Sequence, residues 1–548
     1  MVKEVLLGNE AIVKAALEAG VDFVSGYPGC PAAEVGDEFG KIAKENGIYF
    51  EWSTNEKVAL EAAIGASFSG LKTLVAMKNF GLNVCAEALL PLCYTGTNAP
   101  MVVVVGDDPS CWSSAQTEEN SRGYAFIAHI PVLEPSDCQE CHDFTKLAFE
   151  ISEKFKLPVI LRTTIRVAHQ RAPVQFEETG KKELKKGNFI KNPHQYVTLP
   201  PRVLEMKKEL LEKMEKIQAY AEKEKINFVK GGKSPFGTAQ GKKIGIIASG
   251  VGYLHLMEAQ KEMGLDLPVL KINLFYPLTE KTVADFVKKL NKVLIVEELD
   301  GYLEKETKVI ARESNPKIKI SGKDLLSEIG ELNVEKVGLA LAKLTGKKIK
   351  IVKPQTPDIP RRYAKLCDGC PHFYTFSVIK KVAPENTIFG GDIGCYMIAG
   401  MPPHNIQDYE FCMGSSLGIA HGVRKSTNQK VIALIGDGTF FHSGIAGLIN
   451  TVYNKSNPLI IILDNRITAM TGHQNNPGMG KNGMGEPAQE LNIEEIVRAC
   501  GVKSIKVLDP INVKELEDTV TDFLSKEEVS VIVCKRICAL LARRQQNG

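Results

Sequence analysis

The sequence has no apolar run that approaches the roughly 20 residues needed to cross a membrane. It also lacks, at its start, the charged segment and apolar core of a secretory signal. Its 13 cysteines are odd in number and widely scattered, unlike the disulfide framework of a small secreted domain. We therefore expect a cytoplasmic protein without a membrane span, in which clustered cysteines are considered first as metal ligands.

Marks of nucleic-acid binding and of the common nucleotide-binding loops are also missing. The net charge is only +3, and no basic stripe carries interleaved aromatic residues, so we expect no nucleic-acid partner. The glycine-rich turn at residues 436–438 fails the dinucleotide fingerprint because Phe441 occupies the third glycine position, and no Gly-Lys-Ser/Thr of a P-loop follows. The chain of 548 residues, 44% of them hydrophobic, is ordinary for a soluble protein of several domains.

Short, continuous apolar segments alternate with helical segments along most of the chain. Such segments are typical of parallel strands buried on both faces, so we predict an α/β fold whose parallel sheets are covered by helices on both faces. We divide the chain into an α/β domain over residues 1–172, a charged connector over 173–240, a second α/β domain over 241–350 and a third over 351–548. The Lys- and Glu-rich segment 203–225 predicts an exposed helix in the connector.

The segment 431–474 carries the clearest functional pattern. It predicts a buried strand, a Gly-Asp-Gly turn, a helix and a second buried strand, with Asp437 after the first strand and Asn465 after the second. In open α/β sheets ligands bind outside the carboxyl ends of the strands, and two oxygen-bearing side chains there suit Mg²⁺. The glycines let the backbone approach a diphosphate, and the helix N-terminus favours its charge. The alternative is an ordinary strand–helix–strand unit with an acidic loop.

The last domain contains a cysteine set that three kinds of site could use. Zinc favours four ligands in paired knuckles, a redox dithiol needs a single pair, and a [4Fe–4S] cluster takes four thiolates from loops distant in sequence. The candidates are Cys367 and Cys370 in CDGCPH, Cys395 in GDIGCY and Cys538 beyond the final strand, with Cys534 and Cys412 as substitutes for the fourth ligand. Cys138 and Cys141 share the CxxC spacing but have no second pair, so we predict packed cysteines there.

One carboxylate of the first domain is a candidate for chemistry. Glu56, in STNEKVALEAAIGAS, lies where a predicted strand gives way to an Ala-rich helix. The alternative is a first-turn acid, which the helix dipole favours in many proteins. Position alone leaves both interpretations open.

The chain resembles the alpha subunits of the indolepyruvate:ferredoxin oxidoreductases, within the thiamine diphosphate-dependent 2-oxoacid:ferredoxin oxidoreductases, over nearly its whole length. The most specific part is the segment from Gly436 to Gln474. The other matching segments are GYPGCP at 26–31, EWSTNEKVALEAAIGAS at 51–67, MKNFGLNV at 77–84, VLEPSD at 132–137, LRTTIRVAH at 161–169, CDGCPH at 367–372, GDIGCY at 391–396 and CMGSS at 412–416.

The resemblance implies a multidomain thiamine diphosphate-binding fold and a role for each candidate residue. Residues 1–172 would be the pyrimidine-binding domain, 241–350 a transketolase-C-like domain and 351–548 the diphosphate-binding domain. Glu56 would bond to the pyrimidine ring, and Asp437, the Asn465 side chain and the Ile467 carbonyl would hold Mg²⁺. The implied cofactor contacts are Gly436, Asp437, Gly438, Asn465, Ile467, Cys395 and Met413. The implied [4Fe–4S] ligands are Cys367, Cys370, Cys395 and Cys538, and Cys30 and Asn79 are implied to lie near the substrate. Arg162 and His442 are candidates for binding the substrate carboxylate, and the alternative for each is a structural polar residue.

The function implied is oxidative decarboxylation of an indolepyruvate-like aryl 2-oxo acid to an acyl-coenzyme A, with electrons passed to ferredoxin. The alternative is a non-oxidative thiamine diphosphate-dependent decarboxylase or carboligase. Cys30 and Asn79 stand where the family usually has Thr and His, which leaves other aryl or branched 2-oxo acids open.

The expected partners are a small gamma-type subunit, ferredoxin and a second copy of this chain. Many alpha subunits of the family continue into a ferredoxin-like domain beyond the position of Gly548. We expect that module to be a separate subunit, to be lost or to lie outside this sequence.

Overall fold

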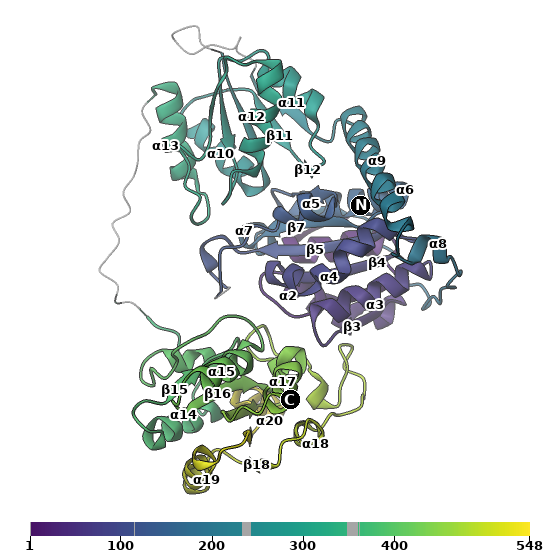
Figure 1. Cartoon of the computed structure of the whole chain (residues 1–548). Coiled ribbons are helices and arrows are strands. Elements are labelled where there is room, and N and C mark those ends of the chain that lie inside the picture. Colours follow the sequence, from purple (N-terminus) through teal and green to yellow (C-terminus); the bar gives the residue numbers. More distant parts are fainter. Residues whose placement is uncertain (1, 114–115, 233–242, 348–359, 361, 548) are drawn as a thin grey trace. The chain divides into compact units, whose positions relative to one another are not determined.

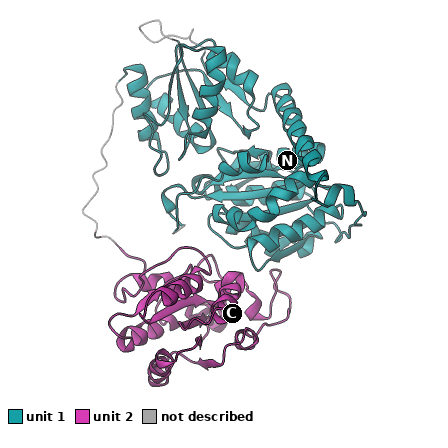
Figure 2. Cartoon of the chain, viewed as in Figure 1, with its two compact units in different colours: residues 1–354 teal, residues 355–548 magenta. Residues whose placement is uncertain are grey.

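The computed structural model describes residues 2–113, 116–232, 243–347, 360 and 362–547 (Figure 1). They form two compact units, residues 1–354 and 355–548, and each is described by itself (Figure 2). The predicted domain boundaries at residues 240 and 350 lie outside the described residues. The predicted boundary at residue 172 falls inside a strand, β8 (Arg171–Phe176), which pairs with β1 (Val2–Leu7) at the start of the chain. The first α/β region therefore extends a few residues further than the sequence predicts.

The first unit contains a seven-stranded sheet in which all neighbours but one are parallel. In spatial order its strands are β12 (Leu274–Tyr276), β6 (Val132–Leu133), β7 (Val159–Thr164), β5 (Met101–Asp107), β4 (Thr73–Lys78), β2 (Phe23–Gly26) and β3 (Tyr49–Trp52). Every residue of β5 and β7 is buried, as expected for a sheet covered on both faces. Since the strands from β6 to β3 run parallel, their carboxyl ends meet at one edge, and the candidate residues of this unit lie at that edge.

Helices cover this sheet, and two antiparallel strands lie beside them. The helix α1 (Gly8–Glu18) packs against α6 (Cys138–Phe155), and α3 (Glu56–Phe68) packs against α4 (Asn79–Thr95). Small residues of α3, such as Ala59 and Ala63, are fully buried and permit this close approach. The shorter helices are α2 (Ala33–Ile42), α5 (Gly123–Ala128) and α7 (Ile165–Ala168).

The charged connector is less exposed than its composition predicts. Its helix α9 (Arg202–Lys223) buries one stripe, formed by Met206, Leu210, Met214, Ile217 and Ala221. These positions repeat every three to four residues, so one face packs while the Lys and Glu side chains occupy the other. The short helix α8 (Pro193–Tyr196) precedes it. The prediction of an exposed helix is wrong for this face, because the charged residues outnumber the apolar ones and obscure the stripe.

A second sheet follows, with the order β14, β13, β10, β11, β9. Its strands are β14 (Lys319–Ser321), β13 (Lys292–Val296), β10 (Ile244–Ser249), β11 (Val269–Ile272) and β9 (Phe228–Lys230). Its helices are α10 (Gly250–Glu262), α11 (Glu280–Val287), α12 (Tyr302–Ser314) and α13 (Val334–Thr345). The strand β12, which comes directly after β11, pairs instead with β6 of the first sheet. This exchange ties the two sheets into one unit.

The second unit is built on a five-stranded parallel sheet with the order β15, β16, β17, β19, β18. Its strands are β15 (Ile388–Gly390), β16 (Val431–Gly436), β17 (Leu459–Asp464), β18 (Ser504–Leu508) and β19 (Ser530–Lys535). Its helices are α14 (Pro371–Val382), α15 (Ser415–Ser426), α16 (Asp437–Thr439), α17 (Ile445–Tyr453), α18 (Ile493–Ala499), α19 (Val513–Ser525) and α20 (Ala539–Asn547).

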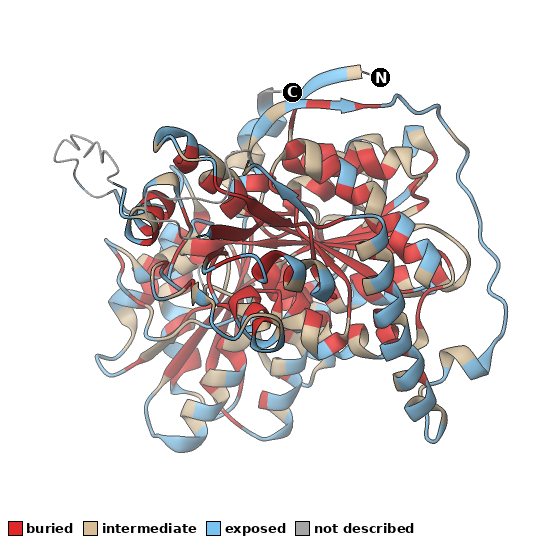
Figure 3. Cartoon of the chain, turned by 90° about the horizontal axis from the view of Figure 1, so that it is seen from above, coloured by how far each residue is buried: buried red, intermediate tan, exposed pale blue. Residues whose placement is uncertain are grey.

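Both faces of the central strand β16 are covered, as its continuous apolar sequence predicts. Ile432 and Leu434 belong to one hydrophobic core, whereas Val431, Ala433 and Ile435 belong to another. This alternation follows from the two-residue period of a strand. Figure 3 shows the central strands of the parallel sheets as buried along most of their length. Among the described residues, no helix combines the length and the apolar character that a membrane crossing requires.

Candidate functional site

The turn at the end of β16 begins a helix whose first turns are irregular. The helix starts at Asp437, directly after Gly436, and continues through a π-helical segment, Phe440–Gly444, into α17. A Cβ at Gly436 would lie 2.5 Å from Cε1 of Tyr396, so only glycine permits this ring to pack against the strand end. π-Helical segments occur frequently at functional sites. The predicted strand–turn–helix–strand order of this segment is confirmed.

The Asp437 carboxylate is buried without a cation beside it. One oxygen accepts a hydrogen bond from the Gly438 N–H at 2.8 Å, and the other accepts from Nδ2 of Asn476 at 3.1 Å. No lysine or arginine of the described residues forms a salt bridge with it. Burial raises the pKa of Asp437 to about 7, with repulsion from Asp464 adding to the effect. A divalent cation at this carboxylate would offset the cost of burying its charge, so the site suits Mg²⁺.

Asn465 lies at the same edge of the sheet as Asp437. The strands β16 and β17 are neighbours, and Gly436 is in register with Leu463. The side-chain oxygen of Asn465 accepts a hydrogen bond from the N–H of Ile467 at 3.1 Å, and its main-chain carbonyl accepts from the Cys538 N–H at 3.0 Å. The sheet therefore brings together the candidate Mg²⁺ ligands, as the motif predicts, and the roles of these residues as ligands stay predictions.

Four of the candidate cysteines influence one another electrostatically. Burial raises the pKa of Cys395 to about 12, and negative charge on Cys370, Cys538 and Cys367 contributes in the same direction. Burial likewise raises the pKa of Cys370 to about 11, with Cys367 and Cys538 contributing. Buried thiolates that repel one another would be stabilised by a positively charged metal centre, and the role of these four cysteines as cluster ligands stays a prediction.

The two substitute cysteines have different surroundings. Cys412 is exposed, and its pKa is raised by partial burial of the thiol and by the negative charge of Asp392. Cys534 is buried within the hydrophobic core of the second unit, and burial raises the pKa of its thiol to about 12. In the part of the chain that the structure describes, no three Cys, His, Asp or Glu side chains lie close enough to hold a metal ion as they stand. The choice of Cys538 as fourth ligand therefore stays a prediction.

A set of polar and aromatic contacts positions the loops around these residues. His372 is buried, burial lowers its pKa to about 4, and its Nε2 lies 3.5 Å from the Asn465 amide. The ring of His372 also meets Tyr396 edge-on, so this histidine is packed against the short 3₁₀-helix that begins at Cys395. Ser443 donates to the carbonyl of Met413 at 2.6 Å and lies 3.0 Å from Nδ1 of His442. The predicted contacts of Met413 with cofactor and of His442 with substrate stay predictions.

In the first unit, Glu56 begins α3 at the edge where the parallel strands end. Asn55 caps the helix by accepting a hydrogen bond from the Val58 N–H at 2.9 Å. Glu56 itself is buried, and a Cβ at Gly81 would lie 2.7 Å from its Cγ. The first turn of α4 therefore packs directly on this side chain. Burial makes Glu56 unlike an ordinary first-turn acid, which faces solvent.

Cys30 and Asn79 lie near Glu56 along the same edge. Cys30 follows β2, and burial raises the pKa of its thiol to about 11, so the thiol is neutral at physiological pH. Asn79 begins α4, is fully buried, and donates from Nδ2 to the Glu119 carbonyl at 3.3 Å. Their predicted contacts with substrate stay predictions.

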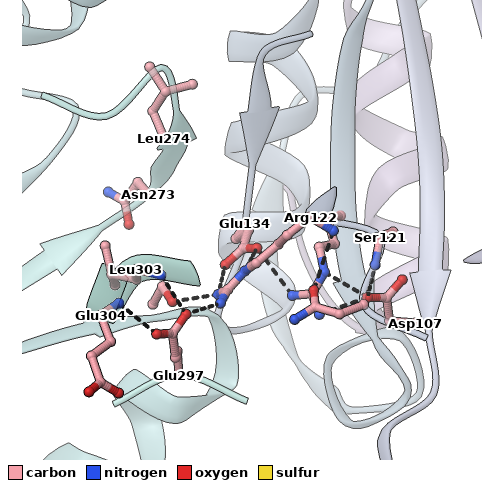
Figure 4. Close-up of polar contacts among 12 residues, drawn as sticks. Asp107, Ser121, Arg122, Glu134, Asn273, Leu274, Glu297, Leu303 and Glu304 are labelled. Carbon is pink, nitrogen blue, oxygen red and sulfur yellow. Dashed lines mark hydrogen bonds and ion pairs between the residues drawn. The ribbon is translucent and has the colours of Figure 1, made fainter. Parts of the chain in front are cut away.

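Arg162 belongs to a buried network of charges that sequence reasoning did not reveal. Figure 4 labels four other members of this network, Asp107, Arg122, Glu134 and Glu297. Its Nε donates to Asp107 at 2.8 Å, and its Nη1 donates to Glu134 at 3.1 Å. Arg122, 1% exposed, also binds Glu134, through two hydrogen bonds of 2.6 Å, and reaches Glu297 of the second sheet at 2.7 Å. Two carboxylates already neutralise Arg162, and its predicted contact with a substrate carboxylate stays a prediction.

Sequence reasoning also missed Asn476 and Lys78. Asn476 holds the Asp437 carboxylate from a loop 39 residues further along the chain, and no local pattern marks it. Lys78 ends β4, next to Asn79 in the segment MKNFGLNV, and its place at a strand end is the signal that could have identified it.

Comparison with known families matches three successive parts of the chain. Residues 14–232 match the thiamine diphosphate-binding domain of the pyruvate flavodoxin/ferredoxin oxidoreductases. Residues 205–362 match the indolepyruvate oxidoreductase domain. Residues 392–534, which contain Asp437 and Asn465, match the C-terminal thiamine pyrophosphate-binding domain of thiamine pyrophosphate enzymes.

Curated relatives match over nearly the whole chain. The indolepyruvate oxidoreductase subunit IorA of Methanothermobacter marburgensis is 43% identical, over 98% of this chain and 87% of the relative. The subunit of the same name from Pyrococcus horikoshii is 41% identical, over 98% of this chain and 86% of the relative. Among solved structures, the 2-oxoglutarate:ferredoxin oxidoreductase of Magnetococcus marinus aligns with a TM-score of 0.49 and 18% identity, over 62% of this chain and 65% of that chain.

Proposed function

Because the chain belongs to the family of the indolepyruvate oxidoreductase subunits IorA, within the thiamine diphosphate-dependent 2-oxoacid oxidoreductases, we propose that it converts an aryl 2-oxo acid to an acyl-coenzyme A and passes the electrons to ferredoxin. The activity of the family is oxidative decarboxylation of a 2-oxo acid. The aryl substrate, the coenzyme A product and the ferredoxin acceptor are the proposed parts.

The observation that supports an oxidative reaction is a contact between one of the candidate cluster cysteines, Cys538, and a proposed magnesium ligand, Asn465. The Cys538 N–H donates to the carbonyl of Asn465 at 3.0 Å, and Cys538 is also one of the charges that act on Cys370 and Cys395. A [4Fe–4S] cluster on Cys367, Cys370, Cys395 and Cys538 would therefore be held against the loop that carries a proposed magnesium ligand. A non-oxidative enzyme has no use for an electron acceptor at this place.

This proposal assigns a role to each of the candidate residues named below. Thiamine diphosphate, when bound, supplies the carbanion that attacks the 2-oxo group. Asp437, the Asn465 side chain and the Ile467 carbonyl hold Mg²⁺, and the helix that begins at Asp437 presents its N–H groups to the diphosphate. Glu56, buried under α4, bonds to the pyrimidine ring. Cys30, Asn79 and His442 contact the substrate.

The chain acts with partner proteins in this proposal. Its relatives are named as subunits, and it spans 87% of the length of the M. marburgensis relative. The partners we propose are a small gamma-type subunit, a ferredoxin or separate ferredoxin-like subunit and a second copy of this chain. We also propose that the enzyme is cytoplasmic.

The first experiment is anaerobic purification followed by iron, sulfide and thiamine analysis of one sample. We expect about four irons per chain, since a [4Fe–4S] cluster contains that number. We also expect reduction of a low-potential acceptor that depends on an arylpyruvate and coenzyme A. Thiamine diphosphate without iron would contradict the oxidative reaction and favour a decarboxylase or carboligase.

Two cysteine variants make this experiment specific. Cys395→Ser removes a member of the proposed cluster set, and we expect it to lose most of the iron and the acceptor reduction. Cys412→Ser is the matched control, because Cys412 is exposed and is not among the charges that shift the pKa of Cys370 or Cys395. Equal iron loss in both variants would contradict the ligand assignment.

A further inference from the structure

Lys78 is held in one position at the end of β4. Its aliphatic stem packs over the turn that follows β2, because a Cβ at Gly29 would lie 2.9 Å from the Lys78 Cγ. Its ammonium lies 4.7 Å from the centre of the Phe80 ring, a distance at which cation and ring attract each other. The lysine is thus a fixed charge rather than a mobile surface side chain.

The Lys78 ammonium is desolvated, yet no ion pair neutralises it within the described residues. Its hydrogen-bond partner is the neutral Oε1 of Gln116, at 3.1 Å. Burial lowers the pKa of Lys78, although the carboxylates of Glu56, Asp108 and Glu119 act in the opposite direction. A buried charge without a close counter-ion is costly, and an anion that contacts it would offset that cost.

Two further polar atoms near Lys78 are buried without a hydrogen-bond partner among the described residues. They are Oδ1 of Asn79, the next residue, and Oε1 of Glu119. Glu119 acts on the charge of Lys78, and burial raises the pKa of Glu119 to about 7. Buried polar atoms in native proteins are almost always paired, and each exception calls for an explanation. A protonated Glu119 carboxyl can donate from Oε1 to a ligand carboxylate, whereas Oδ1 of Asn79 only accepts and needs a donor that a carboxylate does not supply.

The other cations at this edge of the sheet are already engaged. Arg162, on β7, faces Asp107 and Glu134, and Arg122 faces Glu134 and Glu297. Lys78 lies instead among the residues proposed to face the reaction, beside Asn79 and within electrostatic reach of Glu56 and Cys30. Of these three cations, Lys78 is the one whose charge is left for a ligand.

We propose that the Lys78 ammonium binds the carboxylate of the 2-oxo acid, which makes Lys78 a substrate-binding residue. This inference rests on the proposed function and adds to it the group that recognises the acid. The carboxylate loses its charge as carbon dioxide leaves, so the contact stabilises the bound substrate more than the transition state of decarboxylation. Removal of the ammonium is therefore expected to act on KM more than on kcat.

The test compares a charged ligand with a neutral one. In the Lys78→Met holoenzyme we expect the KM for an arylpyruvate to rise about 10–100-fold, the range for loss of a charged hydrogen bond, while kcat changes less than about threefold. Calorimetry measures the dissociation constant of indole-3-propionate, an unreactive carboxylate, and of its amide. We expect the carboxylate to lose affinity by the same factor as the KM rises, and the amide to be unaffected. Lys78→Arg is expected to restore most of the carboxylate affinity.

Lys72→Met is the matched control. Lys72 lies just before the opposite end of the same strand, 3.6 Å from Glu153. We expect this variant to keep the wild-type KM and the wild-type affinity for indole-3-propionate. Fluorescence of Trp52 and Trp112, both in the first unit, verifies that each variant is folded.

The possible failures are distinguishable. An unchanged affinity for indole-3-propionate in folded Lys78→Met, or an equal loss for acid and amide, would overturn the role of Lys78. A wild-type enzyme that neither oxidises an arylpyruvate nor binds indole-3-propionate would instead refute the proposed function.

Discussion

The two units bury charged groups in opposite ways. In the first unit, Arg122 lies between Glu134 and Glu297, with side chains that are at most 2% exposed (Figure 4). Burial opposes its charge, but these carboxylates raise the pKa of Arg122 above its ordinary value. In the second unit, Asp437 and Asp392 are also buried, and no cation of the described residues pairs with them. Burial raises their pKa values to about 7 and about 6.

This difference separates charges that complete the fold from charges that await a ligand. The Arg122 network joins the loops beside β6 of the first sheet and β13 of the second, and each of its charges has a partner within the protein. Its removal leaves unpaired charges, so its role is to hold the unit together. Asp437 has amide partners but no positive charge from the described residues, and a protein that keeps such a carboxylate gains from binding a cation. A buried charge that no opposite charge of the described residues neutralises is thus a physical criterion for locating the ligand-binding site.

The largest effect should come from breaking the network in the first unit. Arg122→Met leaves Glu297 buried without its cation and Glu134 with Arg162 alone, and we expect the free energy of unfolding of this unit to fall by about 3–5 kcal/mol. The two tryptophans of the chain, Trp52 and Trp112, lie in this unit, so their fluorescence during denaturant unfolding reports on it alone.

Arg166→Met is the control for this prediction. Arg166 also forms a two-bond ion pair, with Glu331 at 2.6 Å, but its side chain is 54% exposed. Exposed pairs contribute at most about 1 kcal/mol, so the control should unfold close to the wild type. If both variants lost a similar free energy of unfolding, burial would not determine how much these ion pairs contribute to stability.

The next largest effect should have the opposite sign. Asp437→Asn removes a buried charge that no cation of the described residues compensates, so the metal-free second unit should become more stable at pH 8. A rise in the pKa from 3.8 to about 7 corresponds to about 4 kcal/mol. Hydrogen exchange of peptides from β16 and β17 measures this stability. Added Mg²⁺ and thiamine diphosphate should protect the wild type and leave the variant unchanged.

The pH dependence of this difference follows from the direction of the shift. The folded state raises the pKa of Asp437, so folded protein binds more protons than unfolded protein between about pH 4 and pH 7. The contribution of Asp437 to wild-type stability therefore falls as the pH rises through that range and is constant above it. The stability of Asp437→Asn lacks this dependence, so the stabilities of the two proteins should become equal near pH 4. A difference that is the same at pH 4 and pH 8 would contradict an effect of charge.

The sequence predicts the elements that depend on local pattern. The runs that form β16 and β17 are continuous and apolar, and the position of Asp437 and Asn465 follows from where those runs end. A parallel sheet then places both strand ends at one edge, so this part of the candidate site follows from the sequence alone. The buried position of Glu56 does not, because burial depends on the packing of α4 on α3.

Contacts between residues distant in sequence escaped prediction for a physical reason. Arg122 and Glu297 are 175 positions apart, and neither has a sequence neighbour that signals an ion pair. The exchange of β12 into the first sheet is what brings them together, and a three-residue strand carries little pattern of its own. The hydrogen bond of Cys538 with Asn465 likewise depends on β17 and β19 being neighbours.

The smallest effect should come from the CxxC pair of the first unit, which shares its spacing with Cys367 and Cys370. Cys138 and Cys141 lie on the first turn of α6, both are buried, and burial raises the pKa of both thiols above the ordinary value.

Of the cysteines, only Cys138 contributes to the shift of Cys141, whereas three cysteines contribute to that of Cys395. Replacing both Cys138 and Cys141 by Ser should therefore leave the iron content unchanged and cost about 1 kcal/mol or a little more of stability, since small polar groups enter a packed helix interface. The same double change at Cys367 and Cys370 should remove the iron, because it takes away two of the four proposed ligands. Iron and sulfide analysis of the two double variants tests this prediction. Loss of iron from the Cys138/Cys141 double variant would show that CxxC spacing alone identifies cluster ligands. It would contradict our criterion, which is that several thiols act on one another.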